Sequence, residues 1–181
     1  KILVSLKIDY FINDKTMSSN KLLVSADANE LVRLETKHQQ SNQQGCAKKI
    51  YIIRKIPCTS NNTSNKLPWI GLSDWKDQLK FVVNRNKIVI EDAKIRVKFN
   101  YPLKNPCVVT FHVRTPTIRK KQLIKLIAKK YEKIYAKEEE TTSTMVGTIP
   151  NMYNRNTTNG KYGIWGHVLS DLTLTGLEYN N

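Results

Sequence analysis

The chain is poor in cysteine. Its 181 residues include only Cys46, Cys58 and Cys107. An odd number of cysteines without close spacing does not make a disulfide framework, and it predicts a reducing compartment. No apolar run approaches the roughly 18 residues that a membrane span needs. The opening "KILVSLKIDYF" alternates apolar and polar residues and lacks the apolar core of a signal peptide. We therefore expect a protein that is neither secreted nor membrane-spanning.

Acidic residues are also scarce. Fifteen Asp and Glu stand against 30 Lys and Arg, which gives a formal net charge of +15. A small domain stays soluble with a net charge of roughly 2–8. The excess predicts a polyanionic partner, namely nucleic acid, an anionic membrane surface or an acidic protein surface. The alternative is a coding sequence rich in A and T, which favours Lys, Asn and Ile without selection for charge.

Spacings typical of metal and catalytic sites are absent. The candidate metal ligands are Cys46, Cys58, Cys107, His38, His112 and His167. None lies in CxxC, HxxxH or HExxH spacing, so we expect no metal and no cofactor. Ser170, Asp171 and His167 lie close together in sequence, but a Ser-Asp pair in a turn usually bonds its own backbone. We therefore assign no catalytic residue.

Alternation of apolar and polar residues predicts several β-strands. The clearest is 93–99, "AKIRVKF", with Ile95, Val97 and Phe99 on one face. The other predicted strands are 4–10, 48–56, 106–113, a hairpin of 79–83 and 87–91 around the turn 84–86, and two short strands around Ser170-Asp171. Adjacent antiparallel strands with one wet face fit this pattern.

A long helix is predicted over about 117–138. Leu123, Ile127, Tyr131 and Ile134 share one of its faces. A second, short helix is predicted near 28–38 from a capping pair at its start. Strands grouped around one long helix, without regular βα alternation, indicate the α+β class: an antiparallel β-sheet packed against one long basic amphipathic helix.

The chain is expected to form a single domain over 1–181. Two segments are exceptions to this prediction. Residues 1–16 precede Met17, whose "MSSNKLL" resembles a natural start, so a flexible N-terminal extension is one interpretation. Residues 57–68, "PCTSNNTSNKLP", are polar and bounded by prolines, which predicts a mobile loop.

The charges of the predicted long helix oppose its dipole. Basic residues open it and "KEEE" closes it, whereas the dipole favours the reverse by roughly 0.3–1 kcal/mol per charge. A solvated face is one explanation, because burial of the apolar face outweighs this cost. A second is that the N-terminal cluster and free backbone N–H groups bind an anion. The predicted polyanion-binding residues are Arg119, Lys120, Lys121, Lys125, Lys129, Lys130 and Lys133 of the helix and Lys94, Arg96 and Lys98 of the strand.

The C-terminal third carries a more specific pattern. "LIKLIAKKYEKIYAKEEE", a polar spacer and "GKYGIWGHVLSDLTLTGLEY" resemble a family of short proteins encoded by large eukaryotic DNA viruses, such as algal and amoebal giant viruses. The matching residues are Tyr162, Gly163, Trp165, Gly166, His167, Asp171 and Leu172. The family has no assigned activity, so the resemblance implies a viral context and a place in the particle, and it supplies no catalytic residue.

The same motif has a physical interpretation. Tyr162, Trp165, His167 and Asp171 are expected to form a structural motif. Alternation would place Trp165 and His167 on one strand face, with the Trp in a tightly packed corner between glycines. His167 would donate a hydrogen bond to Asp171 across a turn.

These observations favour a non-enzymatic, basic structural or interaction protein of a large DNA virus particle. It would contact nucleic acid or an acidic protein surface through its Lys-rich helix. Other virion proteins are among the expected partners. Its place would be the virion or the host cytoplasm. The first alternative is a sequence-nonspecific nucleic-acid-binding protein. The second is an enzyme with an unrecognised site around His167.

Overall fold

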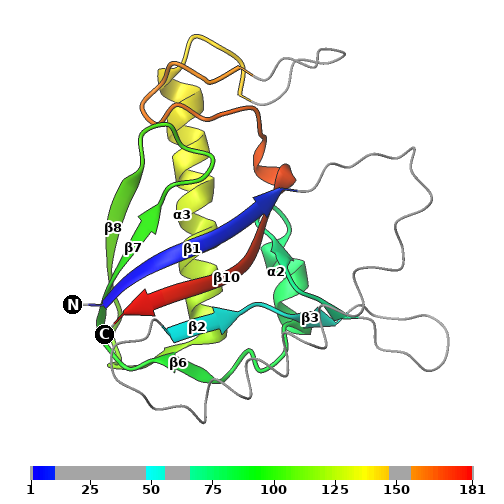
Figure 1. The fold of residues 1–181 in the computed structure, drawn as a ribbon, viewed down its shortest axis with the longest axis vertical. Helices are drawn as coiled ribbons and strands as arrows, with labels where there is room; N and C mark the ends of the chain where they lie inside the picture. The colour runs from blue at the N-terminus through cyan, green and yellow to red at the C-terminus, as the bar shows by residue number, and fades with distance from the viewer. Residues whose placement is uncertain (1, 11–47, 56–65, 147–155, 181) are drawn as a thin grey trace, which may run out of the picture.

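A central β-sheet lies across one long helix (Figure 1). The computed structural model describes residues 2–10, 48–55, 66–146 and 156–180. Strand order in the sheet is β2-β10-β1-β7-β8, and β5 pairs with β10. These strands are β1 (Ile2–Tyr10), β2 (Lys48–Tyr51), β5 (Ile70–Gly71), β7 (Lys94–Phe99), β8 (Cys107–His112) and β10 (Leu172–Asn180).

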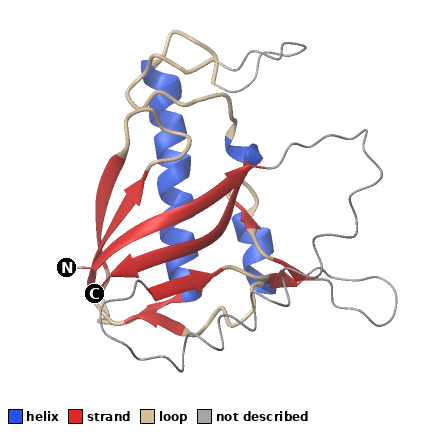
Figure 2. Cartoon of the chain, in the orientation of Figure 1, coloured by secondary structure: helices blue, strands red, loops and turns tan. Residues whose placement is uncertain are grey.

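The remaining elements are short, apart from the long helix. Two-stranded ladders join β3 (Arg54–Lys55) to β4 (Lys66–Leu67) and β6 (Ile88–Ile90) to β9 (Ile118–Arg119). The helices are α2 (Trp75–Gln78), α3 (Lys120–Thr141) and the 3₁₀ turns η1 (Leu79–Phe81) and η2 (Leu169–Asp171). Figure 2 shows one long helix behind the sheet, with the short helices to one side of it.

The core lies between α3 and one face of the sheet. Ile95, Val97 and Phe99 of β7 are fully buried, whereas the residues that alternate with them are exposed. The ring of Tyr131 on α3 meets that of Phe99 edge-on, with centroids 5.1 Å apart. This confirms that the apolar face of the helix covers the apolar face of β7, as the two sequence periods predict.

The α+β class is confirmed, but the sheet is not wholly antiparallel. β1 pairs antiparallel with β10 and parallel with β7. Residues 2–10 therefore form a central strand, and the proposed flexible extension over 1–16 does not apply to them. The other residues of that segment lie outside the described part of the chain.

Four further predictions need correction or fall outside the described residues. The expected hairpin around 84–86 does not form, because β6 pairs with β9 and residues 79–81 form a 3₁₀ turn. The C-terminal segment has one long strand, β10, in place of two short ones. The helix predicted near 28–38 lies outside the described residues, as does most of the loop predicted at 57–68, although 66–67 form β4.

Candidate functional site

The outer face of α3 carries a row of lysines. Lys121, Lys125, Lys129 and Lys133 are all exposed, while the opposite side of the helix is buried. We call these four the helix ridge. Residues four apart advance about 40° beyond one turn, so the ridge slants slowly across the solvent side over about 18 Å of helix length.

The helix ridge has no acidic partner among the residues that the structure describes. Glu132, the one acid inside this stretch, accepts a hydrogen bond from the indole Nε1 of Trp75 at 2.9 Å. Lys137 continues the spacing but pairs with Glu140 at 2.8 Å. The ridge thus ends at Lys133. Its like-charge pairs cost roughly 0.2–0.5 kcal/mol each.

The N-terminal end of α3 is capped by a turn of the chain. The backbone N–H of Lys120 donates to the carbonyl of Lys87, and that of Lys121 donates to the carbonyl of Arg85, both at 2.9 Å. The N–H of Arg119 donates to Oε1 of Gln122 at 2.8 Å. These three N–H groups are therefore not free to bind an anion. The predicted anion site at this end is wrong in so far as it depends on them. The carbonyl dipoles of the turn also offset the positive end of the helix.

Two of the predicted polyanion-binding lysines of α3 do not belong to the ridge. Lys120 is fully buried, and its Nζ donates to the carbonyl of Tyr51 at 3.0 Å. Lys130 is partly buried on the side of Cys107. Burial raises the pKa of the Cys107 thiol above its ordinary value, and the charges of Lys130 and Lys161 offset part of that rise. Lys120 anchors the helix to β2, so a polyanion cannot reach it.

Lys94, Arg96 and Lys98 form a second basic surface, which we call the strand face. All three are exposed and alternate with the buried residues of β7. Because side chains alternate across a strand, the strand face points away from α3. The strand adds positive charge to the molecule but does not extend the helix ridge, since the core separates the two surfaces.

Arg85, Lys87 and Arg119 extend the ridge at its N-terminal end. All three are exposed, and the guanidinium of Arg119 donates to the carbonyl of Asn86 at 2.7 Å. Sequence reasoning missed Arg85 and Lys87 because it placed them in a hairpin of the sheet, Arg85 in the turn and Lys87 at the start of the second strand. The turn itself was visible in "NRNK", but its docking on a helix more than 30 residues later was not.

The acidic C-terminal end of α3 is held by hydrogen bonds. Glu138 is fully buried. Its carboxylate accepts from the N–H groups of Tyr162 and Gly163, at 2.6 and 3.1 Å, and from the hydroxyl of Thr158 at 2.5 Å. Three donors to one carboxylate compensate its burial. The helix dipole disfavours an acid at this end, but Glu138 anchors the "YGIWGH" segment to the helix.

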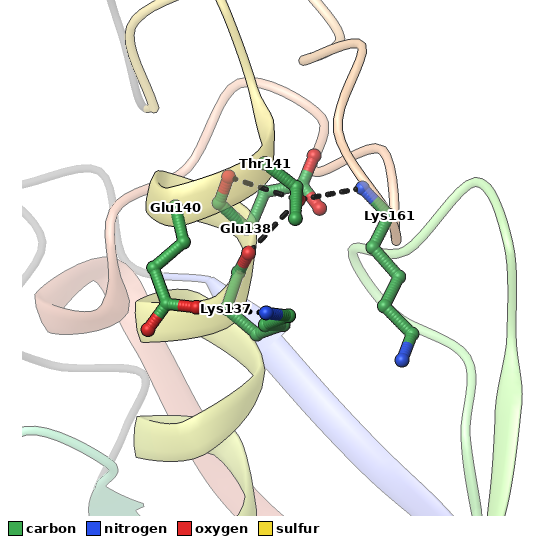
Figure 3. A network of polar contacts seen from close by, with 5 residues as sticks. All are labelled: Lys137, Glu138, Glu140, Thr141 and Lys161. Atoms are coloured by element: carbon green, nitrogen blue, oxygen red, sulfur yellow. Dashed lines mark hydrogen bonds and ion pairs between the residues drawn. The ribbon is translucent and has the colours of Figure 1, made fainter.

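The last turn of α3 is tied to the same loop. The hydroxyl of Thr141 donates to the carbonyl of Lys137 and accepts the N–H of Lys161, at 2.8 and 3.0 Å (Figure 3). Oδ1 of Asn159 accepts from the hydroxyl of Thr142 and the N–H of Ser143. These bonds bind the loop to the helix end and leave little freedom between them.

Glycine is required twice in this loop. A Cβ at Gly160 would lie 2.7 Å from the Glu138 carboxyl carbon and 2.8 Å from the Thr141 hydroxyl. Gly163 has φ of +63°, which side chains rarely adopt, and a Cβ there would lie 3.0 Å from Cβ of Lys104. The loop passes so close to its neighbours that no side chain fits.

His167 lies in a buried polar cluster. It is 1% exposed, its Nε2 lies 2.7 Å from the hydroxyl of Tyr101, and its carbonyl accepts from Tyr135 at 3.1 Å. The expected hydrogen bond to Asp171 is not formed: Nδ1 and Oδ2 are 3.7 Å apart, and Asp171 accepts from the N–H of Val168. An imidazole between a tyrosine and a carboxylate resembles a proton relay, but this one is closed to solvent.

Trp165 departs from its predicted role. It is 41% exposed, whereas its neighbour Ile164 is fully buried. The segment forms only isolated bridges, from Leu103 to Ile164 and from Thr157 to Trp165, in place of a regular strand. Trp165 meets His167 edge-on, with ring centroids 5.2 Å apart. The Trp therefore covers the imidazole from outside and does not fill a packed corner.

Comparisons with known proteins add no relative. No family model, no curated protein and no solved structure matches the chain. Within the described ranges, no helix is long and apolar enough to cross a membrane. The same residues contain no group of three or more His, Cys, Asp or Glu side chains that could hold a metal ion.

Proposed function

We propose that the protein is a basic structural or interaction protein that binds nucleic acid electrostatically through the helix ridge. The observation that carries this proposal is a row of four exposed lysines that form no ion pair with an acid among the described residues. Arg85, Lys87 and Arg119 enlarge the positive surface at one end. Phosphate contacts of this kind supply nearly all sequence-independent binding to nucleic acid.

Nucleic acid fits this surface better than an acidic protein does. The large apolar side chains that are exposed in the described residues are Ile88, Val108, Met145, Trp165 and Val168, and none belongs to α3. Protein interfaces usually have an apolar or aromatic centre surrounded by a polar rim. A ridge of lysines without such a centre suits a phosphate backbone, which offers charge alone.

The viral context rests on the resemblance of the C-terminal third. The "YGIWGH" segment is the part of the loop that Glu138 anchors, which supports a structural role for the motif. We place the protein in the particle of a large DNA virus, or in the host cytoplasm during assembly, where it would meet the genome or other virion proteins. For an enzyme around His167 we find no favourable observation, because the imidazole is 1% exposed.

Binding of the full chain to short duplex DNA and RNA across a salt titration tests this function. Four phosphate contacts predict that log K falls with log salt with a slope of about 3.6 on DNA. The helix variant K121E/K125E/K129E removes three of these contacts, so it should bind more weakly and with a clearly lower slope than the wild type. If the wild type does not bind near physiological salt, or the helix variant keeps the slope, the proposal fails.

A matched variant separates position from total charge. K55E/K76E/K104E replaces three exposed lysines outside the helix ridge and the strand face. Three Lys→Glu changes lower the net charge by 6, from +15 to +9, in this variant and in the helix variant alike. We expect the matched variant to keep most of the slope. Equal losses in the two variants would mean that net charge alone drives binding.

A further inference from the structure

The two basic surfaces lie on opposite sides of one hydrophobic core. Ile95, Val97 and Phe99 of β7 point toward α3 and are fully buried. The strand face therefore points away from α3. The helix ridge lies on the far side of α3 from its own buried residues. In Figure 1 the sheet lies in front of α3, and no described element covers its open face.

Among the residues that the structure describes, the strand face has few acidic neighbours. Its neighbours on the outer side of β8 are His112 opposite Lys94, Thr110 opposite Arg96 and Val108 opposite Lys98, and all three are exposed. The nearest acid along the chain is Asp92, which accepts the N–H of Lys94 at 2.8 Å. Two strands away, Glu178 is paired with Lys49 at 3.8 Å. The three positive charges follow one another at about 6.7 Å spacing along β7.

Each surface is expected to act on its own. The ridge and the strand face are separated by the sheet and by the full width of α3, and a helix with its side chains is about 10–12 Å across. Their separation therefore exceeds the Debye length of about 8 Å at physiological salt. Exposed charges on the two sides therefore interact weakly. Double-stranded DNA has a persistence length of about 50 nm, so a short duplex cannot bend around the molecule to touch both sides.

We infer that the protein bridges two nucleic-acid duplexes, one on the helix ridge and one on the strand face. This inference rests on the proposed function and extends it from binding to cross-linking. A monomer with two opposed phosphate-binding faces holds two segments of a genome together. It then acts in packing the nucleic acid and does not merely coat it.

The test is capture of a fluorescent duplex by an identical duplex fixed to beads, with the full chain added at about 50 mM salt, where phosphate contacts are strong. Wild type should retain the fluorescent duplex. The helix variant K121E/K125E/K129E and the strand variant K94E/R96E/K98E should each still bind a single duplex in an anisotropy assay. Each should lose capture by at least about tenfold, because one face then lacks its roughly three phosphate contacts.

Two controls keep the result interpretable. A neutral strand variant, K94Q/R96Q/K98Q, should also lose capture, and circular dichroism should show that it is folded. An equimolar mixture of the helix and strand variants should not restore capture if the bridge is one molecule. Restored capture would mean that dimers make the bridge, and it would overturn the inference.

The failures of the two proposals are distinguishable. If the wild type binds single duplexes but captures no second duplex, bridging is wrong and the proposed function remains. Capture by the strand variant at the wild-type level would likewise overturn bridging, because the strand face would then be unnecessary. If the wild type binds no duplex at all, both proposals fail together.

Discussion

The two ends of α3 oppose the helix dipole for different reasons. At the N-terminal end, the charges of Arg119 and Lys121 are exposed, and the backbone N–H groups of Lys120 and Lys121 are bonded to a turn. At the C-terminal end, the one buried acid, Glu138, points inward and accepts three hydrogen bonds. The unfavourable acid at one end is thus explained by a loop of the same chain, whereas the exposed basic residues at the other end have no acidic partner among the described residues, and we assign them to nucleic acid only as a proposal.

The largest expected effect comes from removing the buried acid. Glu138→Ala leaves two backbone N–H groups and a hydroxyl without their acceptor, which we expect to lower the free energy of unfolding by about 3–5 kcal/mol. Glu138→Gln should cost less, because one oxygen remains. Urea denaturation followed by circular dichroism measures both changes.

The neighbouring acid provides the control. Glu139 is exposed, so Glu139→Ala should change the free energy of unfolding by less than about 0.5 kcal/mol. Equal effects at the two positions would mean that the loop does not depend on its carboxylate anchor.

A smaller effect is expected from filling the space beside the anchor. Gly160→Ala places a Cβ 2.7 Å from the Glu138 carboxyl carbon, and we expect a loss of about 1–3 kcal/mol from overpacking. Part of that loss should disappear in the Glu138→Ala background, because one of the two clashing groups is gone. Gly71→Ala, which meets only the amide of Gln78 at 3.2 Å, is the control. A cost at Gly160 that stays the same without Glu138 would contradict the packing described here.

Alkaline pH should lower the free energy of unfolding through Tyr131 and Tyr135, whose hydroxyls bond α3 to the loops. Burial raises the pKa of Tyr131 and Tyr135 well above their ordinary value of 10.0. Between that value and the raised pKa, the unfolded chain loses the proton that the folded chain keeps. Stability is therefore fully present below about pH 10 and falls above it, by up to about 1.4 kcal/mol per pH unit for each tyrosine.

Urea denaturation at pH 7, 8, 9, 10 and 11, with absorbance at 295 nm for ionisation, measures this loss. Tyr135→Phe should show a shallower fall, because one of the two groups is removed. A fall that begins well below pH 9, or a slope unchanged in Tyr135→Phe, would show that these tyrosines are not the cause.

The smallest stability effect is expected at the basic end. Lys121→Glu places an acid in the first turn of α3, where the dipole favours it by about 0.3–1 kcal/mol. The variant should unfold at equal or higher urea concentration, although it should bind nucleic acid more weakly. Since the two readouts move in opposite directions, weaker binding cannot be a consequence of unfolding. A destabilised variant would mean that Lys121 supports the fold.

Local patterns predicted the parts of the fold that depend on them. The alternation in β7 and β8 and the apolar face of α3 follow directly from residue spacing, and the structure confirms them. The parallel pairing of β1 with β7 depends on contacts between residues more than 80 positions apart. The turn that caps α3 was recognised as a turn, but its partner was not.

The candidate site was predicted only in part. Spacing of four residues identified the helix ridge, yet it could not show that Lys120 lies on the buried side. Alternation placed Lys94, Arg96 and Lys98 together, but their position relative to α3 depends on which face of β7 the helix covers. In the sequence, Glu138 is one of three consecutive glutamates, and nothing there marks it as buried. The groups that donate hydrogen bonds to its carboxylate lie 20 to 25 residues later.

Differential acetylation of lysines, with and without duplex DNA and read by mass spectrometry, tests the central claim most directly. Buried Lys120 should react poorly in both states. The account predicts protection by DNA of Lys121, Lys125, Lys129 and Lys133, with Lys55 and Lys76 unchanged. Protection spread evenly over all exposed lysines, or none on the helix ridge, would contradict the assignment of this surface to nucleic acid.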